Sequence, residues 1–359
     1  MTPEEQLHHI GLIRELSKPG GVLDTNGPYS TVRNPEWYRP DGRPTAARRE
    51  VHKRIKAEVI SRAKDVRQEG RALVLAGPPG AGKGRVADDV LGDDRAHYVN
   101  VDADEFKKLL LREAIADGSY ESWIKPEVLR ELEAQGERFY PLELASLVHE
   151  ESSKLAKTLR QDLIETRTNV IVDTVLGSEG TARTIGEQFA AAGYEVTVID
   201  VEVTFEISED RIEQRWQEAM REAEIGVADG LGGRWVPSTY ARPLFETVHG
   251  RSKSQDVAEK LAASCPVVTR YERYYTSPQE HEASQREGRA ARPVLEVAKV
   301  RERAGRPLEV KAVAADRTVN ISDQDRPQVT RERLSDEITR RLRNNTGGGE
   351  GPTMKGPRR

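Results

Sequence analysis

The sequence predicts an α/β fold in which helices flank a parallel sheet, preceded by a helical or irregular N-terminal extension. Four runs rich in apolar residues, at 72–76, 97–102, 169–173 and 195–203, alternate with segments of helical periodicity. This alternation is typical of a parallel sheet with crossover helices. The runs are almost continuously apolar, as expected of strands that are covered on both faces. The 359-residue chain is long enough for one large domain with extensions or for two modest domains.

The composition argues against several classes of function. A formal net charge of −4 gives no reason to expect binding to nucleic acid or to an anionic membrane. Cys265 is the single cysteine, so an internal disulfide is excluded and a reducing compartment, the cytoplasm, is favoured. The N-terminus, "MTPEEQLHHIGLIRELSKPGG", has no long apolar run after a basic start, so we expect neither a signal peptide nor a membrane anchor.

The first elements are an extension and a helix. Residues 1–46 combine a short amphipathic segment with closely spaced turn signals such as "SKPGG" and "RPDGRP", which predict an irregular extension. From residue 47, where the predicted core (47–250) begins, the pattern predicts a helix that ends at Gly70. The expected buried face of this helix carries Val51, Ile55, Val59 and Ile60.

A glycine-rich loop follows the first predicted strand, in the stretch "LVLAGPPGAGKGRVADDVLG" (73–92). Glycines let consecutive backbone N–H groups turn toward a phosphate, the next helix adds its positive end, and a lysine neutralises charge. A glycine-rich turn without function is the alternative, but the strand, the spacing and the lysine together favour a P-loop. The predicted nucleotide-binding residues are Gly77, Pro78, Pro79, Gly80, Ala81, Gly82, Lys83, Gly84 and Arg85.

One position departs from the P-loop pattern. A P-loop has Ser or Thr after the lysine, and its hydroxyl binds Mg²⁺, but this chain has Gly84 and then Arg85. The letters "GPPGAGKG" are similar to the loops of adenylate-kinase-like enzymes, which continue with Thr. We therefore expect Mg²⁺ to be held through water and a carboxylate elsewhere, at a site that is weakened but not abolished.

Two carboxylates follow the second predicted strand. Asp102 and Asp104 come at the end of "HYVNVD" and at the start of a predicted helix. Because ligands bind at the carboxyl ends of strands in an open α/β sheet, either residue is a candidate base or metal ligand. The alternative is that one of them only caps the helix.

The segment 142–166 predicts a helix with a carboxylate beside its apolar stripe. The predicted stripe consists of Leu144, Val148, Leu155, Leu159 and Leu163. Glu151 lies at the edge of this stripe, whereas Glu150 points to the opposite side. A carboxylate there needs a partner, so Glu151 either forms a salt bridge or meets a ligand in a cleft. His149 lies off the stripe and is expected at the surface or behind the site.

The third predicted strand ends "NVIVDTVLGS". Asp173 follows the hydrophobic run where a Walker B carboxylate would lie, so it is a candidate ligand for the Mg²⁺ that Gly84 does not bind. Thr174 follows Asp173 directly and is a candidate substrate contact.

The segment "SEDRIEQRWQEAMREAE" predicts a helix capped by Ser208. Its expected buried side consists of Ile212, Trp216, Ala219 and Ala223. Arg215 flanks that side and is a candidate for phosphate binding, whereas Arg211 lies further round. The next loop, "GVADGLGGRWVPSTY", is flexible by composition, carries Arg234, and is suited to close over a nucleotide.

The last part is less regular. Residues 251–330 predict edge strands in "CPVVTRYERYY" and "RPLEVKAVAA", joined by a connection rich in Arg and Glu. Residues 331–359 predict a helix and then a disordered tail, because "NNTGGGEGPTMKGPRR" has almost no apolar side chains.

Four motifs in order, "GPPGAGKG", "NVDADEFK", "LVHEESSKLAKTL" and "NVIVDT", resemble the zeta toxin family of toxin–antitoxin kinases over roughly residues 70–240. The resemblance implies that Asp104, with Asp102 beside it, deprotonates the acceptor hydroxyl and that Glu151 contacts the sugar. It also implies that Arg215 and Arg234 bind ATP phosphates. The family has a small residue and then Thr after the third-strand acid, whereas here Thr174 and Val175 follow.

The resemblance implies an ATP- and Mg²⁺-dependent kinase that phosphorylates a hydroxyl of a UDP-sugar such as UDP-N-acetylglucosamine. It also implies a small helical antitoxin protein as partner. Two alternatives stay open. One is a small-molecule kinase of the adenylate-kinase or antibiotic-phosphotransferase kind, which the loop fits. The other is a nucleotide-binding regulator without catalysis, which Gly84 and Arg85 suggest.

Overall fold

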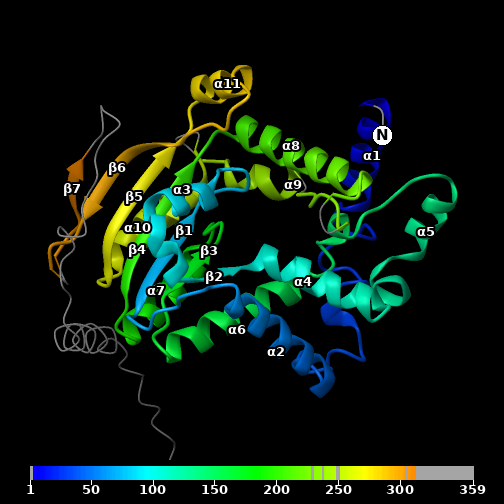
Figure 1. Cartoon of the computed structure of the whole chain (residues 1–359), viewed down its shortest axis with the longest axis horizontal. Helices are drawn as coiled ribbons and strands as arrows, with labels where there is room; N and C mark the ends of the chain where they lie inside the picture. Colours follow the sequence, from blue (N-terminus) through cyan, green and yellow to red (C-terminus); the bar gives the residue numbers. More distant parts are fainter. Residues whose placement is uncertain (1–2, 228–229, 237, 248–250, 304–305, 313–359) are drawn as a thin grey trace, which may run out of the picture.

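The computed structural model describes residues 3–227, 230–236, 238–247, 251–303 and 306–312, and these form an α/β fold around one sheet (Figure 1). The sheet has the strand order β2-β3-β1-β4-β5-β6-β7. The pairs from β2 to β5 are parallel, and β6 and β7 are added antiparallel. The strands are β1 (Arg71–Ala76), β2 (Val99–Asp102), β3 (Val170–Asp173), β4 (Glu195–Glu202), β5 (Val268–Tyr275), β6 (Val294–Val300) and β7 (Glu309–Ala312).

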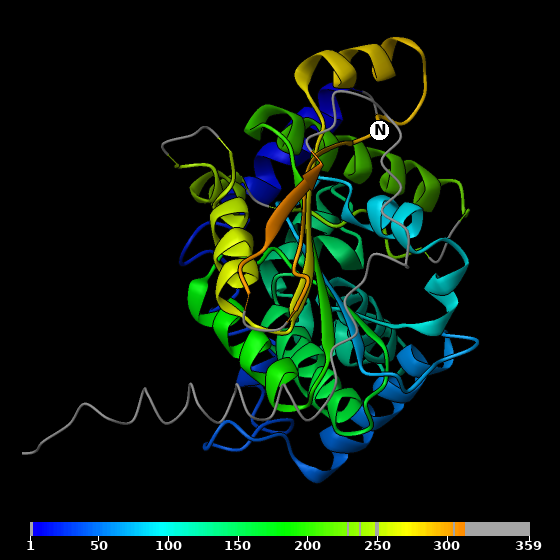
Figure 2. The same cartoon turned by 90° about the vertical axis from the view of Figure 1, so that its left-hand side faces the viewer.

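Helices cover both faces of the sheet, as Figure 2 shows for α10 and α3. The described α-helices are α1 (Pro3–Leu16), α2 (Ala46–Ser61), α3 (Lys83–Leu91), α4 (Ala103–Ala116), α5 (Glu127–Ala134), α6 (His149–Glu165), α7 (Glu179–Ala191), α8 (Phe205–Glu224), α9 (Ser238–Ala241), α10 (Lys253–Ser264) and α11 (Pro278–Arg286). No helix among the described residues is both long and apolar enough to cross a membrane.

Alternate residues of the central strands point to two separate cores. Ala72 and Val74 of β1 face the larger core, which also takes side chains from α2, α4, α6, α7 and α10. Leu73 and Leu75 face a smaller core beneath α3. The predicted parallel sheet with flanking helices is thus confirmed. Its strands are apolar almost throughout because helices cover both of their faces.

The N-terminal extension is part of the folded body. Its first segment forms α1, and Ile10, Ile13 and Leu23 are buried in the larger core. The chain then runs through turns, one of which pairs Tyr38 with Pro44 in an isolated β-bridge. The extension, predicted as helical or irregular, is helical over Pro3–Leu16 and turn-rich after it.

Several predicted boundaries differ from the structure. The helix expected to reach Gly70 ends at Ser61, because the backbone N–H groups of Asp65 and Arg67 turn to bind the carbonyls of Ala96 and His97. Ile60, expected in its buried face, is exposed.

The C-terminal part of the sheet also differs from the prediction. The strand predicted in "CPVVTRYERYY" is β5, which lies between β4 and β6 and is not an edge strand. Strand β6 falls in the stretch predicted as a charged connection. The strand predicted in "RPLEVKAVAA" is β7, at the edge. The helix and tail predicted for 331–359 lie outside the described residues.

Candidate active site

The glycine-rich loop joins β1 to α3 in the conformation that its glycines allow. Gly77 has φ +138°, and a Cβ there would lie 2.2 Å from the carbonyl oxygen of Val201. Gly82 has φ +95° and directly precedes α3, which begins at Lys83. Residues other than glycine rarely adopt these φ values, so glycine is required where the loop bends. The loop thus presents the N-terminus of α3, as a phosphate site requires.

Lys83 lies beside carboxylates of the two neighbouring strands. Its Nζ donates a hydrogen bond to the carbonyl of Gly77 at 3.1 Å and lies 3.6 Å from Oδ1 of Asp173. Asp173 ends β3 and is paired in register with Asp102, which ends β2. The parallel strands therefore bring one lysine and two carboxylates together at their carboxyl ends, where the sequence predicted them.

Asp102 caps a helix, as the sequence allowed, and also lies beside Asp173. Its Oδ1 accepts the backbone N–H of Asp104 at 2.8 Å, so it caps α4. Desolvation, followed by the negative charges of Asp173 and Asp104, raises the pKa of Asp102 to about 7. Helix capping and a place beside Asp173 are therefore combined in one carboxylate.

Asp104 is held between two cations. Lys107 Nζ lies 2.9 Å from its Oδ1 and Arg234 Nη2 lies 2.8 Å from its Oδ2. Desolvation opposes ionisation, but Arg234, Lys107 and Lys83 hold the pKa of Asp104 well below its usual range. The predicted base is thus ionised, and the loop arginine expected at the nucleotide phosphates is attached to it.

Helix α8 lies against the glycine loop through two residues that the sequence interpretation placed elsewhere. Ser208, predicted as the helix cap, lies inside the first turn and donates from its hydroxyl to the carbonyl of Pro79 at 2.7 Å. The cap is Thr204. Arg211 donates to the carbonyls of Gly80 and Ala81 at 3.1 and 3.3 Å.

Arg215 lies one turn beyond Arg211 on α8. It is exposed, and within the described part of the chain it makes no hydrogen bond or ion pair. Residues four apart are neighbours on the surface of a helix, so helical position alone does not separate Arg215 from Arg211 as the phosphate-binding candidate. The contact with the loop distinguishes the two, and it depends on how α8 packs.

Glu151 is enclosed by protein and does not face a cleft. Arg48 binds both of its carboxylate oxygens, from Nε at 2.7 Å and Nη2 at 2.8 Å. His52 Nε2 lies 2.6 Å from the same carboxylate. The salt bridge that the sequence left open is therefore present. The expected sugar contact of Glu151 is not available in this structure, because the side chain is fully buried and both oxygens are occupied.

Two further candidates are Thr174 and His149. The hydroxyl of Thr174 accepts the N–H of Leu176 at 3.1 Å, so it is engaged within its own loop. For His149 the second of the two expected positions, behind the site, agrees with the structure. His149 is partly buried, and desolvation, then the charge of Lys107, lowers its pKa, with Asp104 and Arg234 also acting on it. His149 and Lys107 thus belong to the surroundings of Asp104, and of these two Lys107 was not predicted from the sequence.

The residues near Gly84 fit a magnesium ion only in part. A Cβ at Gly84 would meet no atom of the described residues within 4 Å, so the missing hydroxyl leaves open space there. Asp173 and Asp102 supply the carboxylate oxygens that Mg²⁺ prefers. Among the described residues no group of three or more His, Cys, Asp or Glu side chains is placed to hold a metal. These residues therefore fit an ion that also takes water and phosphate oxygens.

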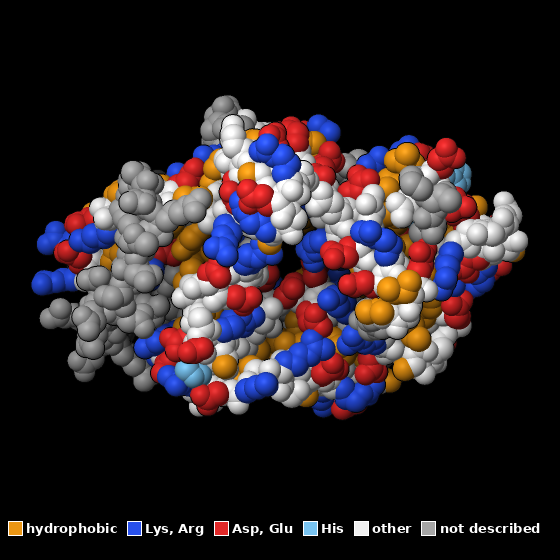
Figure 3. Space-filling model, turned by 45° about the horizontal axis from the view of Figure 1, so that its top comes forward, with side chains coloured by type: hydrophobic (Ala, Val, Ile, Leu, Met, Phe, Trp, Pro, Cys, Tyr) orange, Lys and Arg blue, Asp and Glu red, His pale blue; other side chains and the backbone are white. Residues whose placement is uncertain are grey.

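The surface around this region is strongly charged. Figure 1 shows that α8 and α4 lie on either side of the carboxyl ends of β1, β2 and β3. Figure 3 shows a hollow near the middle of one face, bordered by acidic and basic side chains.

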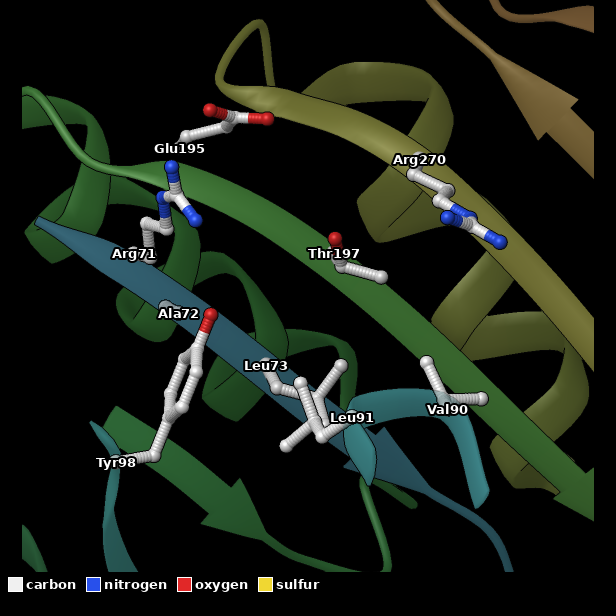
Figure 4. Close-up of a pocket in the computed structure, with 9 residues that line it drawn as sticks. All are labelled: Arg71, Ala72, Leu73, Val90, Leu91, Tyr98, Glu195, Thr197 and Arg270. Atoms are coloured by element: carbon white, nitrogen blue, oxygen red, sulfur yellow. The ribbon is translucent and has the colours of Figure 1, made fainter. Parts of the chain in front are cut away.

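A second depression lies elsewhere, on the α3 face at the amino ends of β1 and β4 (Figure 4). It is lined by Arg71, Ala72, Leu73, Val90, Leu91, Tyr98, Glu195, Thr197 and Arg270. It contains none of the candidate residues and lies at the end of the strands opposite to the glycine loop.

Comparison with known proteins identifies a family and a shared fold. The family model described as Zeta toxin matches residues 56–288. The crystal structure of AvrRxo1-ORF1:AvrRxo1-ORF2 with sulphate ions is similar at 17% identity and a TM-score of 0.51, covering 89% of this chain and 90% of that one. The structure of AvrRxo1-ORF1:-ORF2 with ATP has 18% identity and a TM-score of 0.50, with coverage of 81% and 76%.

A chain of the PezAT chromosomal toxin–antitoxin system of Streptococcus pneumoniae aligns at 17% identity and a TM-score of 0.41, covering 65% of this chain and 79% of that one. No curated protein sequence matches the chain. At these identities the AvrRxo1 likenesses are evidence of fold alone.

Proposed function

The chain belongs to the zeta toxin family, whose model spans residues 56–288, and from this premise we propose that it is an ATP-dependent kinase. The proposed acceptor is a hydroxyl of a nucleotide-activated amino sugar similar to UDP-N-acetylglucosamine. ATP is bound in the structure of AvrRxo1-ORF1:-ORF2, which has a similar fold, and this supports ATP as the donor.

One observation carries the proposal. Lys83 of the glycine loop lies 3.6 Å from Asp173, and Asp173 is in register with Asp102, two residues before Asp104. A phosphate-binding loop facing carboxylates on the adjacent strand ends is the arrangement that phosphoryl transfer needs, because catalysis there is mostly positioning and charge neutralisation. A glycine-rich turn without function would not need these carboxylates beside its lysine.

In the proposed mechanism the loop amides and Lys83 hold the ATP phosphates. The acceptor oxygen attacks the γ-phosphorus, the bond to the β–γ bridging oxygen breaks, and ADP leaves. The hydroxyl proton passes to Asp104, whose carboxylate is ionised in the structure. Arg215 and Arg234 stabilise the charge that develops on the transferred group, and Arg211 fixes the loop from outside.

Asp104 can accept this proton only if Arg234 moves from its carboxylate to the phosphates. The 2.8 Å pair between them therefore describes the enzyme before substrates bind. Asp173 and Asp102, with water and phosphate oxygens, would hold Mg²⁺, which neutralises phosphate charge when it is bound.

The remaining assignments rest on the family. Asp102, Asp173 and Thr174 are proposed to lie near the sugar. Glu151 is proposed to support that region through its pair with Arg48. A small helical antitoxin protein is proposed as partner, as the family implies, and the AvrRxo1-ORF1:AvrRxo1-ORF2 structure, which has a similar fold, includes a second component.

The test is ATP turnover with a panel of UDP-sugars, nucleoside monophosphates and antibiotics, for the wild type, Lys83→Ala and Asp104→Ala. The proposal expects turnover that UDP-sugars stimulate and that both variants lose while remaining folded. Stimulation by monophosphates or antibiotics alone would instead favour a small-molecule kinase. Tight ATP binding without turnover would favour the regulator that the open space at Gly84 suggests.

A further inference from the structure

We infer that the N-terminal helix α1 positions Arg234 in the active site, through contacts that run from His9 to Glu143, Trp216 and Trp235. The helix lies close to one end of α8 (Figure 1), where His9 stacks on Trp216. Helix α1 precedes the segment that the family model matches, 56–288, so the contacts that α1 makes are an addition to the matched domain. The kinetic part of the inference rests on the proposed function, whereas the anchoring part does not.

Glu143 is the centre of these contacts. It lies in the short 3-10 helix Pro141–Leu144 and is 2% exposed. One carboxylate oxygen lies 3.0 Å from His9 Nε2 and accepts the indole N–H of Trp216 at 3.0 Å. The other oxygen accepts the backbone N–H of Tyr140 at 2.8 Å. A buried carboxylate with three partners fixes each of them, because losing one would leave charge unsatisfied.

His9 joins α1 to this carboxylate. It is 1% exposed, and its Nδ1 lies 3.2 Å from Glu137 while its Nε2 faces Glu143. Its ring also stacks on that of Trp216, with centroids 5.9 Å apart. Helix α1 is therefore attached by a buried polar side chain as well as by apolar packing.

Trp216 holds the segment that carries Arg234. A Cβ at Gly233 would lie 2.5 Å from the Trp216 carbonyl oxygen, and a Cβ at Gly232 would lie 2.3 Å from the Cβ of Tyr140. The backbone of residues 232 and 233 thus passes so close to Tyr140 and Trp216 that only glycine fits at these two positions. The backbone N–H of Leu142 also donates to the carbonyl of Leu231 at 2.9 Å.

Trp235 fixes the other side of Arg234. Its ring meets Trp216 edge-on, with centroids 5.8 Å apart, and the guanidinium of Arg14 on α1 lies 5.6 Å from its centroid. Arg234 lies between Gly233 and Trp235, both of which are held, and its guanidinium reaches Asp104 at 2.8 Å. Because a displacement of about 1 Å at a catalytic group costs on the order of 100-fold in rate, a loosened α1 would lower turnover.

The anchoring is tested by hydrogen exchange of the backbone amides at 230–236 in the full-length protein. His9→Ala should speed exchange there about tenfold relative to the amides of 77–85, as expected when a buried hydrogen bond is lost. His8→Ala is the matched control. His8 is the adjacent residue of α1 and lies 3.3 Å from Glu137, but 71% of its side chain is exposed, so the variant keeps the buried pair of His9 with Glu143. Unchanged exchange at 230–236 in folded His9→Ala would overturn the inference.

Trp235 supplies a second test if His9→Ala does not fold. Trp235→Phe keeps an aromatic ring against Trp216 and should retain protection of 230–236. Trp235→Ala should lose protection about tenfold. Equal protection in both variants would count against the inference.

A double-mutant cycle tests the positioning role. His9→Ala should lower kcat about tenfold without changing the Kd for ATP, and it should have no further effect in an Arg234→Ala background. A general loss of stability would instead multiply the two effects. If the wild type phosphorylates no acceptor, the proposed function fails, and the exchange result still decides whether α1 anchors the loop.

Discussion

Arg234 and Asp104 form an ion pair, with Nη2 of the arginine 2.8 Å from Oδ2 of the aspartate. The arginine proposed to stabilise the transferred phosphate and the carboxylate proposed to accept the proton are therefore joined before substrates bind. Lys107 occupies the other carboxylate oxygen at 2.9 Å. Phosphates that attract Arg234 would free one oxygen of Asp104, so ATP binding and activation of the base are coupled in the proposed mechanism.

Replacing Arg234 should reduce catalysis more than ATP binding. In Arg234→Ala the kcat should fall about 100-fold or more, because a cation that meets charge in the transition state is lost. The Kd for ATP should change much less, since the loop amides and Lys83 remain. Steady-state turnover and calorimetric ATP binding measure the two effects. Arg183→Ala, at an exposed position of α7, is the control and should match the wild type.

A hydroxyl at position 84 should strengthen the magnesium site. Gly84→Ser is sterically free, because its Cβ would meet no atom within 4 Å. The variant should reach half-maximal turnover at a lower Mg²⁺ concentration than the wild type, since the new hydroxyl supplies the missing ligand. A Mg²⁺ titration of ATP turnover measures this effect.

Gly80→Ser is the contrasting variant for that titration. Gly80 has φ +75° and its Cβ would lie 2.9 Å from the Ser208 carbonyl oxygen, so the loop should distort and lose ATP affinity. An identical Mg²⁺ requirement in Gly84→Ser and the wild type would show that no metal binds beside the lysine.

The sequence predicted those residues of the candidate site whose positions follow from a local pattern. Lys83 follows from the glycine loop, and Asp102 and Asp173 follow from strands whose carboxyl ends share one sheet edge. It did not predict the pair of His9 with Glu143, because those residues are 134 positions apart and meet only through tertiary packing. It also did not predict the role of Arg211, because Arg211 contacts the glycine loop only where α8 packs against that loop.

The errors in secondary structure have a similar cause. Strand β6, "VLEVAKV", mixes charges with apolar residues in a charged segment, so its pattern is weak until β5 supplies a partner. The helical pattern after Ser61 is locally acceptable, but the 3-10 helix Gly92–His97, which precedes β2, offers the chain other hydrogen bonds. In both places tertiary contacts override local preference.

The Glu151–Arg48 pair should make stability depend on pH in the acid range. Desolvation opposes ionisation, but hydrogen bonds from Arg48 and His52 lower the pKa of Glu151 to about 2. A carboxylate with a lowered folded-state pKa contributes stability above its unfolded pKa of about 4.5, and that contribution is lost as pH falls toward 2.

Glu151→Gln tests this contribution. At pH 7 the free energy of unfolding should fall by about 3–5 kcal/mol, because Arg48 is left buried without its partner. The deficit should shrink between pH 4.5 and 3. Urea unfolding across this range gives the values, with Glu150→Gln, at the partly exposed neighbour, expected to stay within about 0.5 kcal/mol of the wild type. A deficit that stays constant with pH would contradict an ionised Glu151.

His9 should give a stability contribution with the opposite sign. Burial alone would lower the pKa of His9, but Glu143 and Glu137 raise it above its ordinary value of 6.5. A histidine with a raised folded-state pKa contributes stability that is fully present below pH 6.5 and is lost as pH rises through the folded-state value. The wild type should therefore lose part of its advantage over His9→Gln between pH 6 and 9, as thermal unfolding across that range would report. His8→Gln, which keeps the buried pair of His9 with Glu143, should retain this loss of stability. A wild-type advantage that grows with pH would mean that His9 is held neutral and binds Glu143 as an uncharged N–H donor.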